Sequence, residues 1–584
     1  MDNDDRRQWL DLIAALDGPA PPILAAVGCQ LAEPYGRTAE IESLIGAEPA
    51  AGLPSLPAGA GPGLLGQAHE VLAAADEQRT RGAWYTPEPV AFALVGAVLD
   101  GMHDRPLRIC DPAVGGGVFL LAVAEHQVAA GFDPAEVAAG LHGADIDPLA
   151  VRVARAVLAL WAAARGLDWG LADQILVADT LLHRPPDWDP GSFDAVVGNP
   201  PFLGQLSSDT ARSRDRAVAL AVRWGSSIPP YVDDSALFLL LGGELLAEGG
   251  QMVLIQPQSV LAARDAGPIR AAVAEQLNLA GLWLTAEAVF GSAAVRVCAP
   301  MLSRAAATNV ALWEGNPPIP AGVSPNPSEP ARWVEVAARA RGVPPVSVRG
   351  SRTLGDVADL VAGFRDEYYG LVPAVQEDTG EVDRRPLVTS GQIDPGRLVI
   401  DSGGVRFAKQ AWRRPVVDPD LVTDPRARAW LTTTRGPKVL VASQTRVIEA
   451  VVDPRGDLLP STPVVAAMPT GWEPHEIAAV LNSPWATAWL VGRAVGTGLA
   501  VEAVRVSAGQ LAELPLPPDR GALGDTADLL AATRAALTAE QWSDALLELA
   551  RVSNRAYRVA AAEANDLTAW WVRRLPKFRV PPPP

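Results

Sequence analysis

Between residues 107 and 256, short apolar runs alternate with longer stretches of helical periodicity. Strand-like runs lie at 107–111, 140–145, 174–178, 193–197 and 251–256, and helix-like stretches lie at 118–130, 148–164 and 236–248. Strands separated by helices predict a parallel, doubly wound α/β sheet. Ligands of such sheets bind where loops leave the carboxyl ends of the strands. Functional side chains are therefore expected at those ends.

Acidic side chains end three of these predicted strands. Asp111 opens the sequence D-P-A-V-G-G-G-V-F-L, a glycine-rich turn that leads into a helix, and Asp145 and Asp179 end the next two strands. Glycines let the backbone approach a ligand, and the helix N-terminus adds N–H donors. The turn fits neither a dinucleotide fingerprint nor a phosphate-binding loop. One acid could hold a ribose diol and another an adenine amino group, although each alone is more often a helix cap.

The tetrapeptide Asn199-Pro200-Pro201-Phe202 follows the predicted strand 193–197. The two prolines fix the backbone and remove N–H donors, so the carbonyl of Pro200 is expected to point outward. The Asn199 amide oxygen and that carbonyl could together accept both protons of a planar amine, which directs the nitrogen lone pair at an electrophile. Phe202 offers a face on which a base can stack. A purely structural turn is the alternative.

Composition excludes several classes of protein. The chain has 49 Lys+Arg against 67 Asp+Glu, a net charge of −18, so bulk charge does not attract it to nucleic acid. Three scattered cysteines rule out a disulfide framework and a cysteine zinc site. No apolar run approaches the roughly 18 residues of a membrane span, and no signal peptide is evident, which indicates the cytoplasm. Scattered histidines predict no metal site, and with lysine only at 409, 438 and 577 there is no acid-x-Lys nuclease motif.

These motifs together resemble the gamma-class S-adenosylmethionine-dependent DNA adenine-N6 methyltransferases of type I modification subunits and type IIG-like enzymes. The resemblance begins at Trp84-Tyr85-Thr86-Pro87, continues through the glycine turn, the acids and N-P-P-F in family order, and reaches the segment A-V-F-G-S-A-A-V-R-V at 288–297. It covers about residues 82–305. Val114 and Gly116 depart from the Cys and Ser that the family usually has in the glycine turn.

The resemblance implies an activity and a role for each matching residue. The cofactor would be S-adenosyl-L-methionine, and the product an adenine methylated at N6 after the base has been flipped out of the duplex. Thr86 and Asp111 would contact the methionine moiety, Asp145 the ribose and Asp179 the cofactor adenine. The implied catalytic residues are Asn199, Pro200, Phe202 and Phe290, and the implied cofactor-binding residues are Tyr85, Thr86, Asp111, Ala113, Gly115, Gly117, Asp145, Ile146, Asp179, Thr180 and Asn199.

The fold expected from both lines of argument is α/β. Residues 76–305 are expected to form a class I, Rossmann-like methyltransferase domain with a mixed sheet. Residues 1–75 read as a helical segment without visible chemistry, and the Pro- and Gly-rich stretch 306–345 reads as a linker. Residues 346–520 show short strands and turns, which predict a mixed α/β target-recognition domain. Residues 521–584 form a helical segment and tail.

A basic stretch lies within the predicted recognition domain. Between residues 384 and 446 there are twelve cations and five anions, although the whole chain is acidic. A positive face of this kind suits contact with phosphates, and a solvated loop surface is the alternative. The predicted DNA-binding residues are Arg385, Arg406, Lys409, Arg413, Arg414, Lys438 and Arg446.

Two other functions fit part of the pattern. Enzymes that methylate RNA or a protein glutamine also use N-P-P-[YF], but they are usually shorter and lack a β-rich recognition domain. A defence component that binds the cofactor and DNA without catalysis is the second alternative, and the intact Asn199 and Phe202 argue against it. The expected partner is double-stranded DNA, and any restriction activity would come from a separate restriction or defence subunit.

Overall fold

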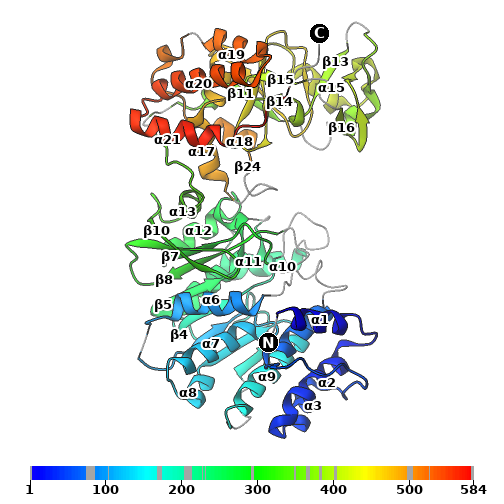
Figure 1. Ribbon diagram of the computed structural model, residues 1–584, viewed down its shortest axis with the longest axis vertical. Helices are drawn as coiled ribbons and strands as arrows, with labels where there is room; N and C mark the ends of the chain where they lie inside the picture. Colours follow the sequence, from blue (N-terminus) through cyan, green and yellow to red (C-terminus); the bar gives the residue numbers. More distant parts are fainter. Residues whose placement is uncertain are drawn as a thin grey trace. The chain divides into compact units, whose positions relative to one another are not determined.

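The structure is a computed structural model, and its chain divides into two compact units, residues 1–337 and 338–584. It describes residues 3–73, 86–102, 104–167, 174–202, 213–225, 228–229, 232–290, 295–347, 350, 352–362, 369–380, 384–399, 404–495, 504–524 and 526–579. Each unit is described by itself below (Figure 1).

The first unit is built on one ten-stranded mixed sheet with the order β10-β9-β7-β8-β5-β4-β1-β2-β3, with β6 paired to β8. Strands β3, β2, β1, β4 and β5 run parallel, β8 is antiparallel to β5 and β7, and β9 is parallel to β7. The strand bounds are β1 Ile109–Asp111, β2 Leu141–Asp145, β3 Ile175–Val177, β4 Phe193–Gly198, β5 Leu246–Leu254, β6 Gln256–Pro257, β7 Asn278–Leu284, β8 Val297–Ser303, β9 Asn309–Glu314 and β10 Ile319–Pro325. This confirms the predicted α/β class with a mixed sheet.

Helices alternate with the strands of this sheet. They are α6 Glu88–Leu99, α7 Val118–Ala129, α8 Pro134–Ala139, α9 Pro148–Ala163, α10 Arg214–Trp224, α11 Asp234–Leu245 and α12 Gly267–Ala274. Of these, α6, α7, α9 and α11 pack against the sheet. Two of these helices begin at an acidic cap, because the side chains of Asp147 at α9 and Asp233 at α11 accept hydrogen bonds from backbone N–H groups of the first turn. Proline at the first position of α9 is preorganised for a helix.

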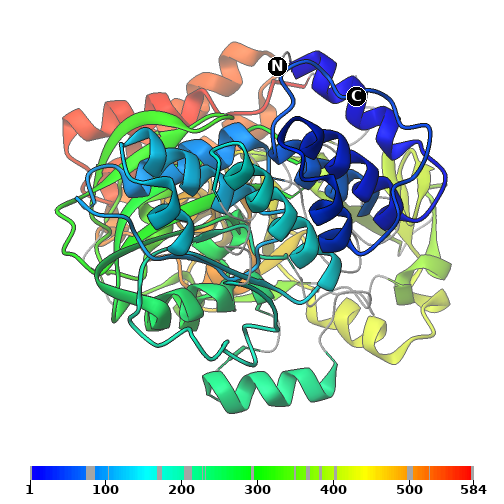
Figure 2. The same ribbon diagram turned by 90° about the horizontal axis from the view of Figure 1, so that it is seen from below.

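The N-terminal helices are part of this first unit. They are α1 Asn3–Ala14, α2 Ala20–Ala32, α3 Thr38–Ile45 and α4 Gly63–Ala73. Their apolar side chains, such as Ile13, Leu24 and Leu65, belong to the same buried core as Ile109 of β1 and Val157 of α9. Helices α2, α3 and α4 pack against α9, and the blue helices lie beside it in both views (Figure 2).

The stretch 306–345 differs from the predicted linker. It forms β9 and β10, which extend the main sheet through pairing of β9 with β7, and the helix α13 Trp333–Ala340. The Pro- and Gly-rich sequence at 315–320 forms the turn of the β9–β10 hairpin, at 315–318, and the start of β10. Hairpin turns and linkers are both rich in Pro and Gly. The pairing of β9 with β7 and β10 is what shows that this stretch is part of the sheet.

The second unit is mixed α/β, as predicted. Two four-stranded sheets have the orders β11-β23-β19-β21 and β12-β18-β13-β22, and three strand pairs, β14–β15, β16–β17 and β20–β24, lie beside them. The strands are β11 Ala358–Ala362, β12 Val375–Glu377, β13 Arg385–Val388, β14 Ile393–Asp394, β15 Arg397–Leu398, β16 Val405–Phe407, β17 Gln410–Trp412, β18 Pro415–Val417, β19 Lys438–Ala442, β20 Gln444–Thr445, β21 Glu449–Asp453, β22 Leu459–Pro460, β23 Val465–Pro469 and β24 Val504–Arg505. The helices are α15 Pro425–Thr433, α16 Pro474–Leu481, α17 Pro484–Ala494, α18 Ala508–Ala512, α19 Thr526–Ala535, α20 Ala539–Ala556 and α21 Ala561–Val572.

Candidate active site

A cavity of about 560 Å³ lies in the first unit at the carboxyl ends of β1, β2, β3 and β4. This is the size and place expected of a small-molecule site in an α/β sheet. The predicted site residues that line it are Thr86, Asp111, Ala113, Gly115, Asp145, Ile146, Asp179, Thr180 and Asn199. The structure thus brings together residues that come from five separate segments of the sequence.

The glycine turn is held in place by the acid of the next strand. Asp145 accepts hydrogen bonds from the backbone N–H of Gly115 at 3.0 Å and of Asp147 at 2.9 Å. Gly115 has φ 49° and Gly117 has φ 85°, left-handed values that favour glycine. Burial raises the pKa of Asp145 above its usual range, although these backbone hydrogen bonds oppose the shift.

Asp111 lies at the end of β1 with almost no exposed surface. Its Oδ1 accepts a hydrogen bond from the N–H of Ala113 at 3.0 Å. Gly198, at the end of β4, makes room for it, because a Cβ at position 198 would lie 2.5 Å from that same oxygen. Burial raises the pKa of Asp111 to about 8. The site therefore holds a carboxyl group whose ionised form a cationic ligand would stabilise.

The shifted pKa of Asp111 predicts a pH dependence of stability. Between about pH 4 and pH 8 the carboxyl is ionised in the unfolded chain but still protonated in the folded one. The folded state then binds more protons, so the free energy of unfolding falls as the pH rises through this window. In Asp111→Asn this contribution disappears. Thermal unfolding from pH 5 to 8 should show the variant losing less stability than the wild type, and parallel curves would contradict the assignment.

Asn199 follows β4 and lies at the wall of the cavity. Its Nδ2 donates a hydrogen bond to Oγ1 of Thr86 at 3.0 Å, and Thr86 is buried. This hydrogen bond uses the amide nitrogen, so the amide oxygen is the atom of Asn199 that is suited to accept a proton from a substrate amine. Thr180 also lines the cavity, and its hydroxyl donates to the carbonyl of Pro112 at 2.9 Å.

Several predicted residues do not line the cavity. Phe202 and Phe290 are buried and contact each other, with ring centroids 6.1 Å apart and planes tilted by 55°. Pro201 lines the cavity in place of its neighbour Pro200, which is buried. Gly117 shapes the turn without lining the cavity. Tyr85 lies outside the described residues.

The cavity also contains residues that the sequence analysis missed. Helix α4 contributes His69 and Glu70, α10 contributes Arg216, and α11 contributes Asp234. The Arg216 guanidinium forms ion pairs with Asp179 and Asp234, so in this structure an arginine engages the acid expected to meet the cofactor adenine. No motif marked these residues, and the two glycines within α4 were the available signal of a close approach.

The predicted DNA-binding residues divide into buried and exposed groups. Arg385 is buried and donates hydrogen bonds to the carbonyls of Leu431, Thr434 and Leu458 at 2.7, 3.0 and 3.1 Å. Lys438 is fully buried and paired with Asp453 at 2.6 Å. These two side chains therefore stabilise the second unit from inside. This differs from the prediction, because charge counted along a sequence does not reveal burial.

The exposed group gathers at the hairpin of β16 and β17 and the residues that follow it. Arg406 and Lys409 lie on the hairpin, Lys409 at the turn with φ 65°, and Arg413 and Arg414 come directly after β17. The carboxylate of Glu377 accepts the backbone N–H of Arg413 at 2.6 Å and of Arg414 at 2.9 Å. These hydrogen bonds fix the backbone of Arg413 and Arg414, while both residues remain exposed. Arg446 is exposed elsewhere in this unit.

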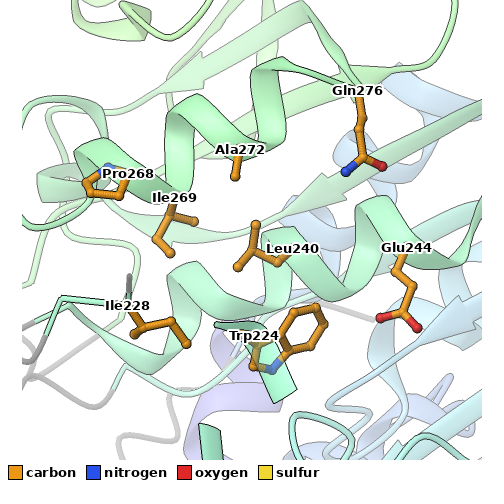
Figure 3. A pocket seen from close by; sticks show the side chains of 8 residues that line it. All are labelled: Trp224, Ile228, Leu240, Glu244, Pro268, Ile269, Ala272 and Gln276. Atoms are coloured by element: carbon orange, nitrogen blue, oxygen red, sulfur yellow. The ribbon is translucent and has the colours of Figure 1, made fainter. Parts of the chain in front are cut away.

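A smaller hollow of about 310 Å³ lies between α10, α11 and α12 in the first unit (Figure 3). Its lining is mainly apolar, with Trp224, Leu240 and Ile269 facing one another. The carboxylate of Glu244 at its edge is held by Arg184 and Arg223. It therefore lacks the converging polar groups of the larger cavity.

Residues 62–315 match the family model described as N-6 DNA methylase. The matched segment includes the cavity and the strands that build it. The match agrees with the resemblance drawn from the motifs.

Two curated relatives match parts of the chain. The type II methyltransferase M.PaeR7I of Pseudomonas aeruginosa is 30% identical over 238 residues, 36% of this chain and 38% of that protein. The type II methyltransferase M.XamI of Xanthomonas campestris pv. amaranthicola is 32% identical over 122 residues, 21% of this chain and 20% of that protein. The chain thus spans less than two fifths of the length of either relative.

One solved structure resembles almost the whole chain. It is the type IIL restriction-modification enzyme MmeI in complex with DNA, with a TM-score of 0.65, 12% identity, and coverage of 98% of both chains. At this identity the likeness concerns the fold alone. Among the described residues no helix has the length and apolarity to cross a membrane, and no cluster of His, Cys, Asp and Glu has metal-binding geometry.

Proposed function

We propose that the chain transfers a methyl group from S-adenosyl-L-methionine to the N6 amine of an adenine in double-stranded DNA, as a gamma-class enzyme of restriction-modification. The observation that carries the proposal is the Asn199-Pro200-Pro201 turn at the wall of an acidic, nucleoside-sized cavity. A turn of this kind suits a planar amine, and the cavity beside it suits a cationic donor. The residues present therefore fit both reactants.

The acidity of the cavity favours this cofactor over an anionic nucleotide. Six carboxyl groups line it, from Glu70, Asp111, Asp145, Asp147, Asp179 and Asp234, against one arginine. S-adenosylmethionine carries a sulfonium and an α-ammonium group, and when bound it supplies an electrophilic methyl group. We assign its ribose to Asp145, its methionine moiety to Thr86 and Asp111, and its adenine to Asp179. Residues Ala113, Gly115, Ile146 and Thr180 complete the proposed cofactor contacts.

The target amine is assigned to Asn199 and Pro200. Their oxygens accept its two N–H groups, which leaves the nitrogen lone pair for the methyl carbon. Holding the reacting atoms about 3 Å apart supplies much of the catalysis. The base must leave the duplex to reach this position, at a cost of a few kcal/mol. Phe202 and Phe290, adjacent to each other near this turn, are proposed to stack on the extruded base.

DNA contact is assigned to the exposed cations of the second unit, Arg406, Lys409, Arg413, Arg414 and Arg446, without the buried Arg385 and Lys438. Each phosphate contact makes the slope of log affinity against log salt more negative by about 0.9. Replacing Arg413 and Arg414 by alanine should therefore make that slope less steep by about 1 to 2. Filter binding to duplex DNA at several salt concentrations measures it, and an unchanged slope would remove this surface from the interface.

The function is tested by transfer of a tritiated methyl group. Isothermal titration first establishes cofactor binding. The chain is then incubated with labelled S-adenosylmethionine in three separate reactions, which contain duplex DNA, RNA or protein as the acceptor. The proposal expects label in DNA alone. Label in RNA or protein would support the second kind of methyltransferase, and binding of cofactor and DNA without transfer would support the non-catalytic alternative.

A further inference from the structure

Helix α4 is the part of the N-terminal segment that reaches the cavity. It spans Gly63–Ala73, and His69, Glu70 and Ala73 from its last turns line the cavity together with the glycine turn. The sequence offered no chemistry for this segment. In the structure it supplies one wall of the site.

The helix reaches the cavity because it touches the glycine turn backbone to backbone. A Cβ at Gly66 would lie 2.6 Å from the carbonyl oxygen of Gly116, and a Cβ at Gly116 would lie 2.9 Å from the Cα of Gly66. Neither position can therefore carry a side chain without moving the helix or the turn. Gly116 is where the family usually has serine, so this departure is matched by a glycine on α4.

Two polar side chains of this wall have no hydrogen-bond partner among the described residues at one atom each, His69 at Nδ1 and Glu70 at Oε2. His69 is 7% exposed. Burial lowers the pKa of His69 and raises the pKa of Glu70 well above its usual range. The like charge of Glu88 contributes to the shift of Glu70, and Glu88 is itself paired with Arg6 at 2.5 Å. A buried polar group without a partner is costly unless a ligand satisfies it.

The position of Glu70 in the cavity indicates which part of a ligand it meets. Its neighbour Glu88 lies two residues after Thr86, the residue assigned to the methionine moiety. For His69, the nearby charge that acts on its pKa is that of Asp147, two residues after Asp145, the residue assigned to the ribose. Glu70 also lies about one helical turn after Gly66, on the side of α4 that touches the glycine turn opened by Asp111, the second residue assigned to the methionine moiety. This geometry favours the methionine end of the cavity for Glu70.

We propose that α4 is a wall of the cofactor pocket, held on the glycine turn by the Gly66–Gly116 contact, and that Glu70 binds the α-ammonium group of S-adenosylmethionine. The proposal rests on the cofactor binding proposed above. A carboxylate facing an ammonium group in a dry cavity gives a short, charge-assisted hydrogen bond. Glu70 thereby anchors the amino-acid end of the cofactor while Asp145 anchors the ribose.

The test compares three ligands by isothermal titration with the full chain. S-adenosylmethionine and S-adenosylhomocysteine both carry the α-ammonium group, and 5′-methylthioadenosine lacks it. Glu70→Gln is expected to weaken the first two by roughly 10- to 100-fold and to change the third by less than about threefold. Equal loss of all three ligands, or no loss of any, would overturn the role of Glu70.

The packing contact is tested with a matched pair of glycine substitutions. Gly66→Ala should weaken all three ligands by about tenfold or more, because the new methyl group displaces the wall from the turn. Gly96→Ala, in α6, places its methyl group in open space and should leave binding unchanged. Equal behaviour of the two variants would contradict the contact.

Two further measurements separate this proposal from the function on which it rests. Glu136→Gln, an exposed change on α8, controls for loss of a charge, and circular dichroism checks that each variant is folded. If the wild type binds none of the ligands, the cofactor assignment itself fails. If the wild type binds and Glu70→Gln binds equally well, only the inference about Glu70 fails.

Discussion

Asn199→Ala is expected to reduce methyl transfer to DNA by roughly 100-fold or more while changing S-adenosylmethionine affinity by less than about threefold. The variant removes the amide oxygen proposed to hold the target amine and leaves the carboxyl groups that line the cofactor cavity. The loss should appear in single-turnover rates, because it concerns alignment in the chemical step. Titration of the same preparation with cofactor measures the affinity.

Two variants bracket this result. Thr86→Val removes the hydrogen bond that orients the Asn199 amide but keeps the amide itself, so a smaller loss of about tenfold is expected. Asn278→Ala, at an exposed position at the start of β7, should leave transfer unchanged. Near-native turnover of Asn199→Ala would show that the amine is held by other groups.

Arg385→Met is expected to destabilise the second unit by about 3–5 kcal/mol, because each buried carbonyl that loses its partner costs about 1–3 kcal/mol. The arginine is 6% exposed, and its guanidinium links β13 to the carbonyls at the end of α15 and in the loop before β22. Methionine fills a similar volume but removes the guanidinium donor from all of those carbonyls. A single substitution therefore removes the hydrogen bonds that join β13 to two other parts of the unit.

Urea unfolding of the full chain measures this effect, with hydrogen exchange of the segment 425–434 to locate it. Arg413→Met is the matched control, because the same chemical change at an exposed position should alter the free energy of unfolding by less than about 0.5 kcal/mol. It should nevertheless weaken DNA binding. If both variants unfold alike, the buried guanidinium contributes little to stability.

The parts of the fold that could be predicted are those controlled by local sequence. The strands ending at Asp111, Asp145 and Gly198 were predicted to within a few residues, because apolar runs followed by turn residues mark buried parallel strands. The acids at their ends converge on one cavity, as the geometry of parallel strands requires. The N-P-P-F turn was found for the same reason, since its chemistry is contained in four consecutive residues.

The parts that could not be predicted depend on contacts between distant residues. Glu70 lines the cavity because the backbone of Gly66 contacts that of Gly116, 50 positions further along the chain. Nothing in the sequence around either glycine identifies the other as its contact. The buried state of Arg385 depends on carbonyls from α15 and from the loop before β22. Arg216 reaches Asp179 and Asp234 from a helix in which Leu220 alone is buried, so its sequence gives no sign of a place in the cavity.

The central claim is that the amine held by Asn199 is the N6 of adenine. Genomic DNA from cells expressing the chain, digested to nucleosides and analysed by mass spectrometry, tests it most directly against DNA from cells expressing Asn199→Ala. The account predicts N6-methyldeoxyadenosine with the wild type and its absence with the variant, in a host that lacks its own adenine methylation. N4-methyldeoxycytidine in its place, or no methylated nucleoside, would contradict the account.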